Sequence, residues 1–82
     1  MNIEQTSKIL AMIALLENRK FTDEQIAAWQ VILRDIDIEH ASQAVTRYYQ
    51  NQTEQIKPAH VYRLAKEIKV ESGKKIYGNL DK

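Results

Sequence analysis

The chain lacks cysteine, and among its 82 residues it has only two glycines, one proline and two histidines. The absence of cysteine excludes a disulfide framework, thiolate zinc sites and cysteine nucleophiles. An all-β domain needs many turn residues, so the scarcity of glycine and proline argues against a β-sandwich or barrel. No hydrophobic run approaches the ~18 residues of a membrane span. The N-terminus also lacks the pattern of a secretory signal peptide.

The remaining composition is typical of a small globular domain. Hydrophobic residues make up 44% of the chain and charged residues 28%, which argues against a disordered protein. The length fits one domain. We therefore expect a small cytoplasmic protein with an all-α fold, whose core contributes only ~3–5 kcal/mol of net stability.

Four segments carry the hydrophobic spacing of amphipathic helices. Asn2 and Gln5 mark the start of the first, and Thr22 and Gln25 mark the start of the second, each pair in the spacing of a capping box. Pro58 suits the first turn of the fourth helix. We predict a compact four-helix domain over residues 1–73, with a short flexible tail over residues 74–82. The predicted helices cover residues 3–18, 23–34, 38–50 and 58–72.

The apolar positions of these helices predict the core. We expect Trp29 and Tyr48 to be its large anchors, whereas Tyr49 and Tyr62 fit the buried stripes less well and are candidates for the surface. Lys57 is a poor N-cap residue for the fourth helix. The other predicted core positions are Ile9, Leu10, Met12, Ile13, Leu15, Leu16, Ile26, Ile32, Leu33, Ala41, Ala44, Val45, Val61, Leu64, Ala65 and Ile68.

The sequence contains no motif of catalysis or of cofactor binding. It has no glycine-rich phosphate loop, and His40 and His60 fall on different predicted helices. We expect a capping or surface role for His40 and an exposed position for His60. Asp35, Asp37 and Glu39 form a cluster of carboxylates, but no glycine-containing calcium loop surrounds them, and helix capping explains Asp37 and Glu39 better than a metal does. We therefore expect no enzymatic activity, no cofactor and no metal.

The charge is unevenly distributed along the chain. Residues 1–41 carry a net charge of −3 and residues 42–82 carry +4, within a total of +1. The fourth predicted helix has an aromatic–basic face that suits phosphates or an acidic protein surface, although a solvated lysine-rich face explains it equally simply. This basic strip, our candidate partner-binding site, consists of Tyr62, Arg63, Lys66 and Lys69, extended by Lys74 and Lys75.

The order of these features resembles that of a known family. A leading apolar helix is followed by Phe21, Thr22-Asp23-Glu24-Gln25, Trp29, Leu33 and Asp35, then by an alanine-rich helix ending in Tyr48-Tyr49, and finally by Ile56-Lys57-Pro58-Ala59-His60-Val61. Over about residues 5–70 the chain resembles the N-terminal helical domain of phage replicative-helicase loader/inhibitor proteins. Related segments often place Thr or Ser before the proline, where this chain has Lys57.

The resemblance implies a role in protein–protein contact. Members of this family bind the hexameric replicative helicase, hold it inactive and deliver it to an origin complex, and a flexible C-terminal region is associated with helicase binding. We therefore expect an adaptor of phage-type DNA replication that binds a replicative helicase or an origin-binding replication protein, as a loader or as an inhibitor. Because the chain ends at Lys82, we expect either a shortened piece or a member without a long tail.

Two other functions remain open. One is a small DNA-binding helical regulator of a phage or mobile element, and the other is an unassigned small interaction domain. The net charge of +1 and the pI of about 8.0 predict at most weak, non-specific binding to nucleic acid. The sequence does not indicate an oligomeric state.

Overall fold

The computed structural model describes the backbone of residues 1–80 and the side chains of residues 1–72. Over this range the chain is all-α and contains no strand, as predicted. None of its helices has the length and apolar character needed to cross a membrane. The four helices are α1 (Ile3–Glu17), α2 (Asp23–Leu33), α3 (Ile38–Asn51) and α4 (Pro58–Leu80).

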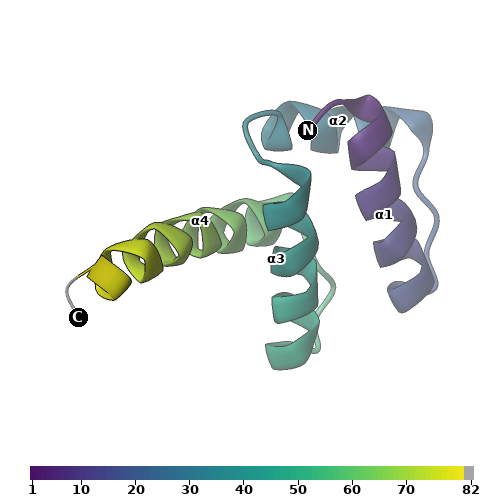
Figure 1. The fold of residues 1–82 in the computed structure, drawn as a ribbon. Coiled ribbons are helices and arrows are strands. Elements are labelled where there is room, and N and C mark those ends of the chain that lie inside the picture. The colour runs from purple at the N-terminus through teal and green to yellow at the C-terminus, as the bar shows by residue number, and fades with distance from the viewer. Residues whose placement is uncertain (81–82) are drawn as a thin grey trace.

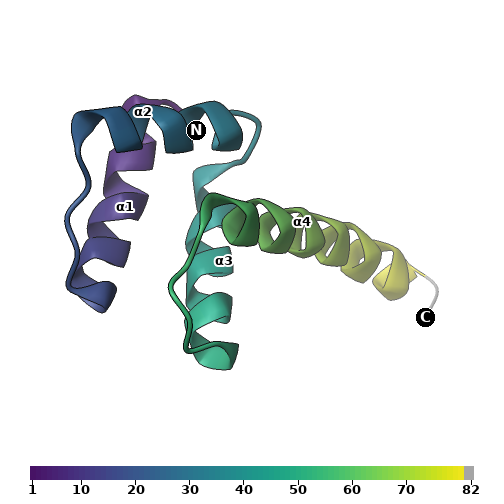
Figure 2. The same ribbon diagram turned by 180° about the vertical axis from the view of Figure 1, so that it is seen from behind.

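The helix α3 is the centre of the arrangement. It packs against α4 and α1, while α2 packs against α1 and α4. Figures 1 and 2 show α1 and α3 side by side, α2 across one end of both, and α4 crossing α3 and projecting beyond it. Within the described residues α1 and α4 do not contact each other, so they offer surfaces on different sides of the molecule.

Both predicted capping boxes are present. The side chain of Asn2 accepts a hydrogen bond from the N–H of Gln5 at 2.8 Å, and Gln5 Oε1 accepts one from the N–H of Asn2 at 3.1 Å. Thr22 and Gln25 form the same pair at the start of α2, at 3.1 and 2.8 Å. Each box satisfies two of the N–H groups that a helix start leaves without an intrahelical acceptor.

The starts of α3 and α4 differ from the predicted ones. Asp37 occupies the N-cap position of α3, but its side chain makes no capping hydrogen bond. At the start of α4, the N–H of Lys57 donates to Nδ1 of His60 at 2.9 Å, and the His60 ring stacks on Tyr48 with 4.8 Å between ring centroids. His60 therefore takes the role that Glu or Gln has in a capping box. The prediction that His60 is exposed was wrong, because the residue is half-buried.

The core follows the predicted stripes of α3 and α4 closely. Trp29 and Tyr48 are buried, as expected, and Trp29 packs edge-to-face on Phe21 with 5.7 Å between ring centroids. Ala41 and Ala44 are fully buried on α3, where their short side chains allow neighbouring helices to approach closely. The largest fully buried apolar side chains are Leu10, Ile13, Leu33, Val45, Ile56 and Val61.

Three predicted core residues are instead exposed. Leu15 is 86% exposed, Leu16 58% and Ile32 47%. The reason is that α1 packs only on α2 and α3, so the face that it buries is narrower than its apolar stripe. Ile32 lies on the outer side of α2, next to Val31, which is 61% exposed.

The fourth helix is longer than predicted. We expected it to end at residue 72 with a tail from residue 74, but α4 continues to Leu80. A glycine inside a helix costs only about 1 kcal/mol relative to alanine, so Gly73 does not have to end it, and Lys74 and Lys75 are good helix formers. The side chains of Lys74 and Lys75, and residues 81–82 of the predicted tail, lie outside the described part of the chain.

Candidate functional site

The basic strip on α4 is anchored in the core at one residue. Arg63, Lys66 and Lys69 are exposed, whereas Tyr62 is half-buried and packs against the core. The ammonium group of Lys66 lies 5.4 Å from the centroid of the Tyr62 ring, within the range of a cation–π contact. Tyr62 thus packs beneath Lys66, and Arg63 and Lys69 are exposed on the same helix.

The structure divides the strip between two sides of α4. Arg63 lines a hollow of about 600 Å³ between α3 and α4, together with Arg47, Tyr48 and His60. Lys66 and Lys69 line a smaller hollow of about 130 Å³ on the other side, which we call the Asp35 hollow because Asp35, Asp37 and His40 are its other polar residues. The predicted residues share one helix, but they do not form one continuous surface.

The three cations of the strip whose side chains the structure describes lack direct acidic partners among the described residues. Among the described residues, neither Arg63 nor Lys66 nor Lys69 has a carboxylate oxygen within 4.0 Å. Arg47 is different, because Glu71 accepts from both of its terminal nitrogens at 2.7 and 3.2 Å. This hydrogen bonding raises the pKa of Arg47 above its ordinary value. The charge available to a partner therefore lies on the strip rather than on Arg47.

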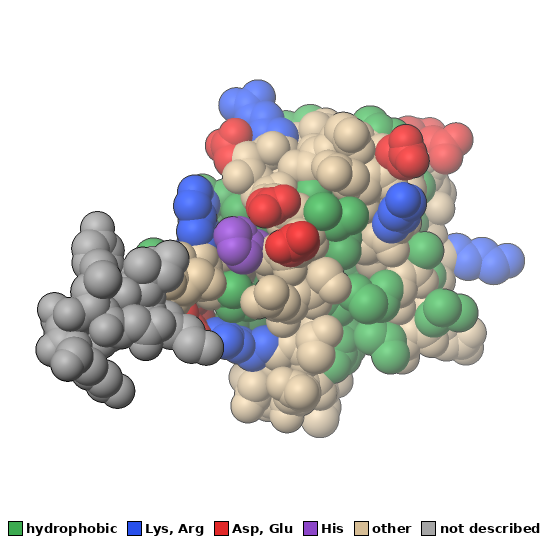
Figure 3. Space-filling view, in the orientation of Figure 1, with side chains coloured by type: hydrophobic (Ala, Val, Ile, Leu, Met, Phe, Trp, Pro, Cys, Tyr) green, Lys and Arg blue, Asp and Glu red, His purple; other side chains and the backbone are tan. Residues whose placement is uncertain are grey.

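The Asp35 hollow carries both signs of charge. Asp35 and Asp37 are exposed and line it opposite the two lysines, with half-buried His40 beside them. Figure 3 shows acidic, basic and histidine side chains next to one another over the start of α3. In the described part of the chain, no three histidine or acidic side chains lie close enough together to hold a metal ion.

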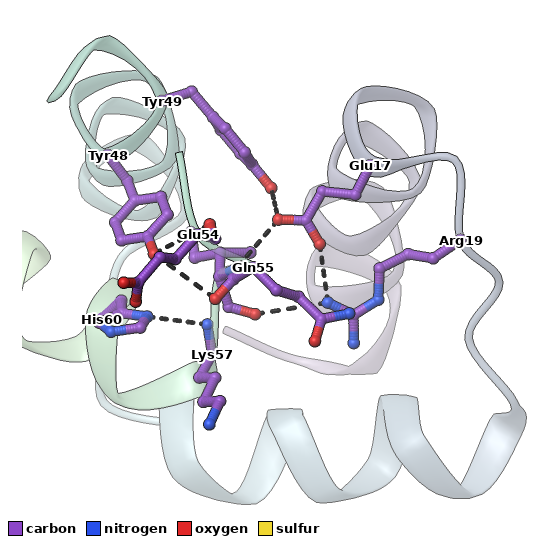
Figure 4. A network of polar contacts seen from close by, with 9 residues as sticks. Glu17, Arg19, Tyr48, Tyr49, Glu54, Gln55, Lys57 and His60 are labelled. Atoms are coloured by element: carbon purple, nitrogen blue, oxygen red, sulfur yellow. Dashed lines mark hydrogen bonds and ion pairs between the residues drawn. The ribbon is translucent and has the colours of Figure 1, made fainter. Parts of the chain in front are cut away.

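A second polar cluster, which the sequence did not reveal, surrounds Glu17 at the end of α1 (Figure 4). Its carboxylate accepts hydrogen bonds from the hydroxyl of Tyr49, from the N–H of Ile56 at 2.9 Å and from Arg19 at 2.8 Å. These bonds join α1 to α3 and to the connection that precedes α4. Tyr49, predicted as a surface candidate, is therefore part of the framework.

The titration properties of this cluster follow from its contacts. Burial raises the pKa of Glu17, but the hydrogen bonds from Tyr49, Arg19 and Ile56 favour the charged form and hold the pKa below its ordinary value. Burial, followed by the bond to Glu17, raises the pKa of Tyr49 well above its ordinary value. Glu17 is thus ionised at neutral pH, and its charge is directed into the protein.

A further contact fixes the connection before α4. The hydroxyl of Tyr48 donates to the carbonyl oxygens of Glu54 at 3.1 Å and Gln55 at 3.4 Å, and Figure 4 shows His60 against the same ring. Because His60 also accepts from Lys57, the first turn of α4 is held on the last turns of α3. Arg63 lies one turn further along α4, so its backbone is held in place by these contacts.

The N-terminal ammonium group of Met1 binds the end of α2 and the turn that follows it. The N-terminal nitrogen of Met1 donates to the carbonyl oxygens of Leu33, Arg34 and Ile36 at 3.0, 3.0 and 2.7 Å. The last carbonyls of a helix have no intrahelical donor and carry partial negative charge, so a cation there is favourable. No sequence motif indicated this contact, because its partners are more than 30 residues apart.

No protein-family model matches the chain, and neither the curated proteins nor the solved structures contain a significant match to it. The geometry of α4 and the resemblance of the sequence are therefore what supports a function.

Proposed function

We propose that this protein is an adaptor of phage-type DNA replication, without catalytic activity of its own, that binds a replicative helicase or its origin partner through the outer side of α4. The observation that carries the proposal is that Arg63, Lys66 and Lys69 are exposed and have no acidic partner within 4.0 Å among the described residues. The start of their helix is held by His60 and Tyr48, so little order has to be gained on binding.

Tyr62 adds an aromatic contact to this charged surface. Tyrosine and arginine are enriched at the centres of protein interfaces, whereas charged groups at the rim mainly set the association rate and its salt dependence. Tyr62 is half-buried beneath Lys66, which leaves part of its ring for a partner. Arg63 follows it directly and extends into the hollow between α3 and α4.

The acidic groups beside the strip favour a protein partner over DNA. Lys66 and Lys69 share their hollow with Asp35 and Asp37, so a phosphate backbone that approaches them also meets two carboxylates. Non-specific DNA affinity depends on the number of phosphates that are neutralised, and this surface neutralises few. A protein surface, in contrast, can present acidic groups to the lysines and donors to the carboxylates.

Surface plasmon resonance against an immobilised replicative helicase hexamer tests the proposal. Replacing Arg63, Lys66 and Lys69 together by Glu should slow association by about tenfold or more. The matched control replaces Ala28, Arg34, Gln43 and Lys57 by Glu, which changes the net charge by the same amount at exposed positions outside the strip. Circular dichroism should show unchanged helicity for both variants, because all seven side chains are exposed.

Two outcomes contradict the proposal. One is that the α4 variant binds like the wild type while the control loses binding, which places the interface elsewhere. The other is that the wild type ignores the helicase and binds a particular duplex DNA sequence tightly near physiological salt, which favours the DNA-binding regulator.

A further inference from the structure

The last two turns of α1 present an apolar surface that the fold leaves uncovered. Leu15 is 86% exposed and lines an open hollow of about 730 Å³ together with Ala11 and Ala14, bounded by Asn18, Arg19 and Lys20. Figure 3 shows hydrophobic side chains gathered over the lower half of α1. Single exposed leucines are ordinary on protein surfaces, but Leu15 adjoins two further apolar side chains, and the three together form an apolar surface that a partner can cover. We call this patch, from Ala11 to Lys20, the α1 surface.

The shape of the α1 surface suits a helix. Ala11 and Ala14 have the shortest apolar side chains and lie three residues apart, so a backbone that packs over them can approach closely. Leu15 stands beside them as a projecting side chain that a partner helix can receive between its own residues. Because α2 and α3 cover only the other side of α1, nothing within the described residues obstructs this approach.

Two lysines flank the α1 surface. Lys8 lies one turn before Ala11, and Lys20 follows the helix next to Arg19, whose charge is paired with Glu17. Lys20 has no ion pair in the described part of the chain, and Lys8 has only a loose one, at 4.0 Å from exposed Glu4. Glu17, the one acidic residue between positions 11 and 20, is turned inward and bonded to Tyr49, Ile56 and Arg19.

We propose that the α1 surface binds an amphipathic helix of another protein, with leucine-type side chains on its apolar face and acidic residues on its flanks. The apolar face would cover Leu15 and the two alanines, and the acidic flanks would meet Lys8 and Lys20. Since α1 and α4 do not contact each other, this site is separate from the one on α4 and does not depend on it.

The test uses a pair of synthetic amphipathic peptides of about five helical turns, identical in their leucine face but carrying either glutamate or lysine on the flanks. Each is titrated into the full, nitrogen-15-labelled chain and followed by NMR. The glutamate peptide should shift the amide signals of residues 11–20, and the lysine peptide should bind about tenfold more weakly or not at all. Leu15→Glu should weaken binding by about tenfold or more, whereas Val31→Glu, at an exposed apolar position of α2, should not.

Four results would overturn this proposal. They are the absence of any shift, equal binding of the two peptides, shifts confined to α4, and equal weakening by the two substitutions. A fifth is a concentration-dependent shift of residues 11–20 without peptide, which would assign the surface to a second copy of the chain. Shifts confined to α4 would assign the acidic peptide to the basic strip and so support the proposed function, and the other results do not bear on helicase capture by α4. The two proposals therefore fail independently.

Discussion

Replacing Glu17 by glutamine tests whether one carboxylate holds the end of α1, the end of α3 and the connection to α4 together. One oxygen of this carboxylate accepts from Arg19, and the other accepts from both Tyr49 and the N–H of Ile56. Glutamine has almost the same shape, but it replaces one acceptor oxygen by an NH₂ donor. Whichever way the amide is turned, either Arg19 or the N–H of Ile56 then faces a donor.

The expected cost follows from these three bonds. A hydrogen bond to a charged group contributes about 1.5–3 kcal/mol net, against about 0.5–1.5 kcal/mol for a neutral one. Weakening the bonds from Tyr49 and Ile56 and removing the charge opposite Arg19 should therefore cost about 2–3 kcal/mol. The Glu17 side chain is only 11% exposed, so water can replace few of the hydrogen bonds that the substitution weakens. Arg19, at 23% exposed, is better solvated, and its bond contributes least. In a domain with ~3–5 kcal/mol of net stability, most of the folding free energy is lost.

The pH dependence separates this effect from a simple loss of packing. Because the folded-state pKa of Glu17 lies below its ordinary value of 4.5, its stabilisation is complete above that pH and is lost as the pH falls through the folded-state pKa. The wild type should therefore lose more stability than the glutamine variant between about pH 5 and pH 3. Tyr49 acts in the opposite direction, since its raised pKa makes stability fall as the pH rises above 10.0.

Urea denaturation followed by circular dichroism, at neutral pH and at about pH 5 and pH 3, measures the free energy of unfolding of each variant and its pH dependence. Tyr49→Phe serves as the matched variant, because it removes one donor and leaves the carboxylate in place, at a cost of about 1–2 kcal/mol. The double variant should cost less than the sum of the single ones, since both act on the bond between residues 17 and 49. Equal urea midpoints for wild type and Glu17→Gln, or parallel losses on acidification, would refute the reasoning.

Two further predictions concern the stability of the fold. Trp29→Ala should cost about 3–5 kcal/mol, because it empties a buried site against Phe21, and the cooperative thermal transition should disappear; a melt near that of the wild type would contradict this. Adding two residues before Met1 replaces an ammonium group that serves three carbonyls by an amide with one N–H, and thermal unfolding should show a loss of about 2–4 kcal/mol. The same two residues added after Lys82 are the control, and equal effects at the two ends would argue against a structural role for the amine.

The features that the sequence predicted well are those decided by neighbours in the chain. The capping boxes at Asn2 and Thr22 need only a partner three residues away, and both form. The buried faces of α3 and α4 repeat at helical spacing, because α3 meets the core along its length and α4 meets it from Val61 to Ile68. Pro58 begins α4 for an equally local reason, since its missing N–H would have no acceptor there.

The features that were missed depend on which helices meet. Glu17 and Tyr49 are 32 residues apart, and nothing in either local sequence marks them as partners. Hydrophobic spacing placed Leu15 and Leu16 in the core, but it does not tell how many neighbours a helix has, and α1 has two. His60 was overlooked as a cap because histidine at the third helical position accepts the N-cap N–H only when its ring is oriented, here by Tyr48.

The basic strip shows the same limit at the level of function. Helical spacing places Arg63, Lys66 and Lys69 on the outer part of α4, and all three are exposed there. The groups that face these cations come from other parts of the chain. Asp35 and Asp37, in the turn between α2 and α3, lie opposite the two lysines, whereas Arg63 lines the separate hollow between α3 and α4. The charge of +4 in the second half of the chain therefore overstates the field that a partner meets beside Lys66 and Lys69. The hollow between α3 and α4 is lined by two arginines, Arg47 and Arg63. Arg47 is bonded to Glu71, whereas Arg63 has no carboxylate oxygen within 4.0 Å among the described residues, and its charge is the one that a partner meets there.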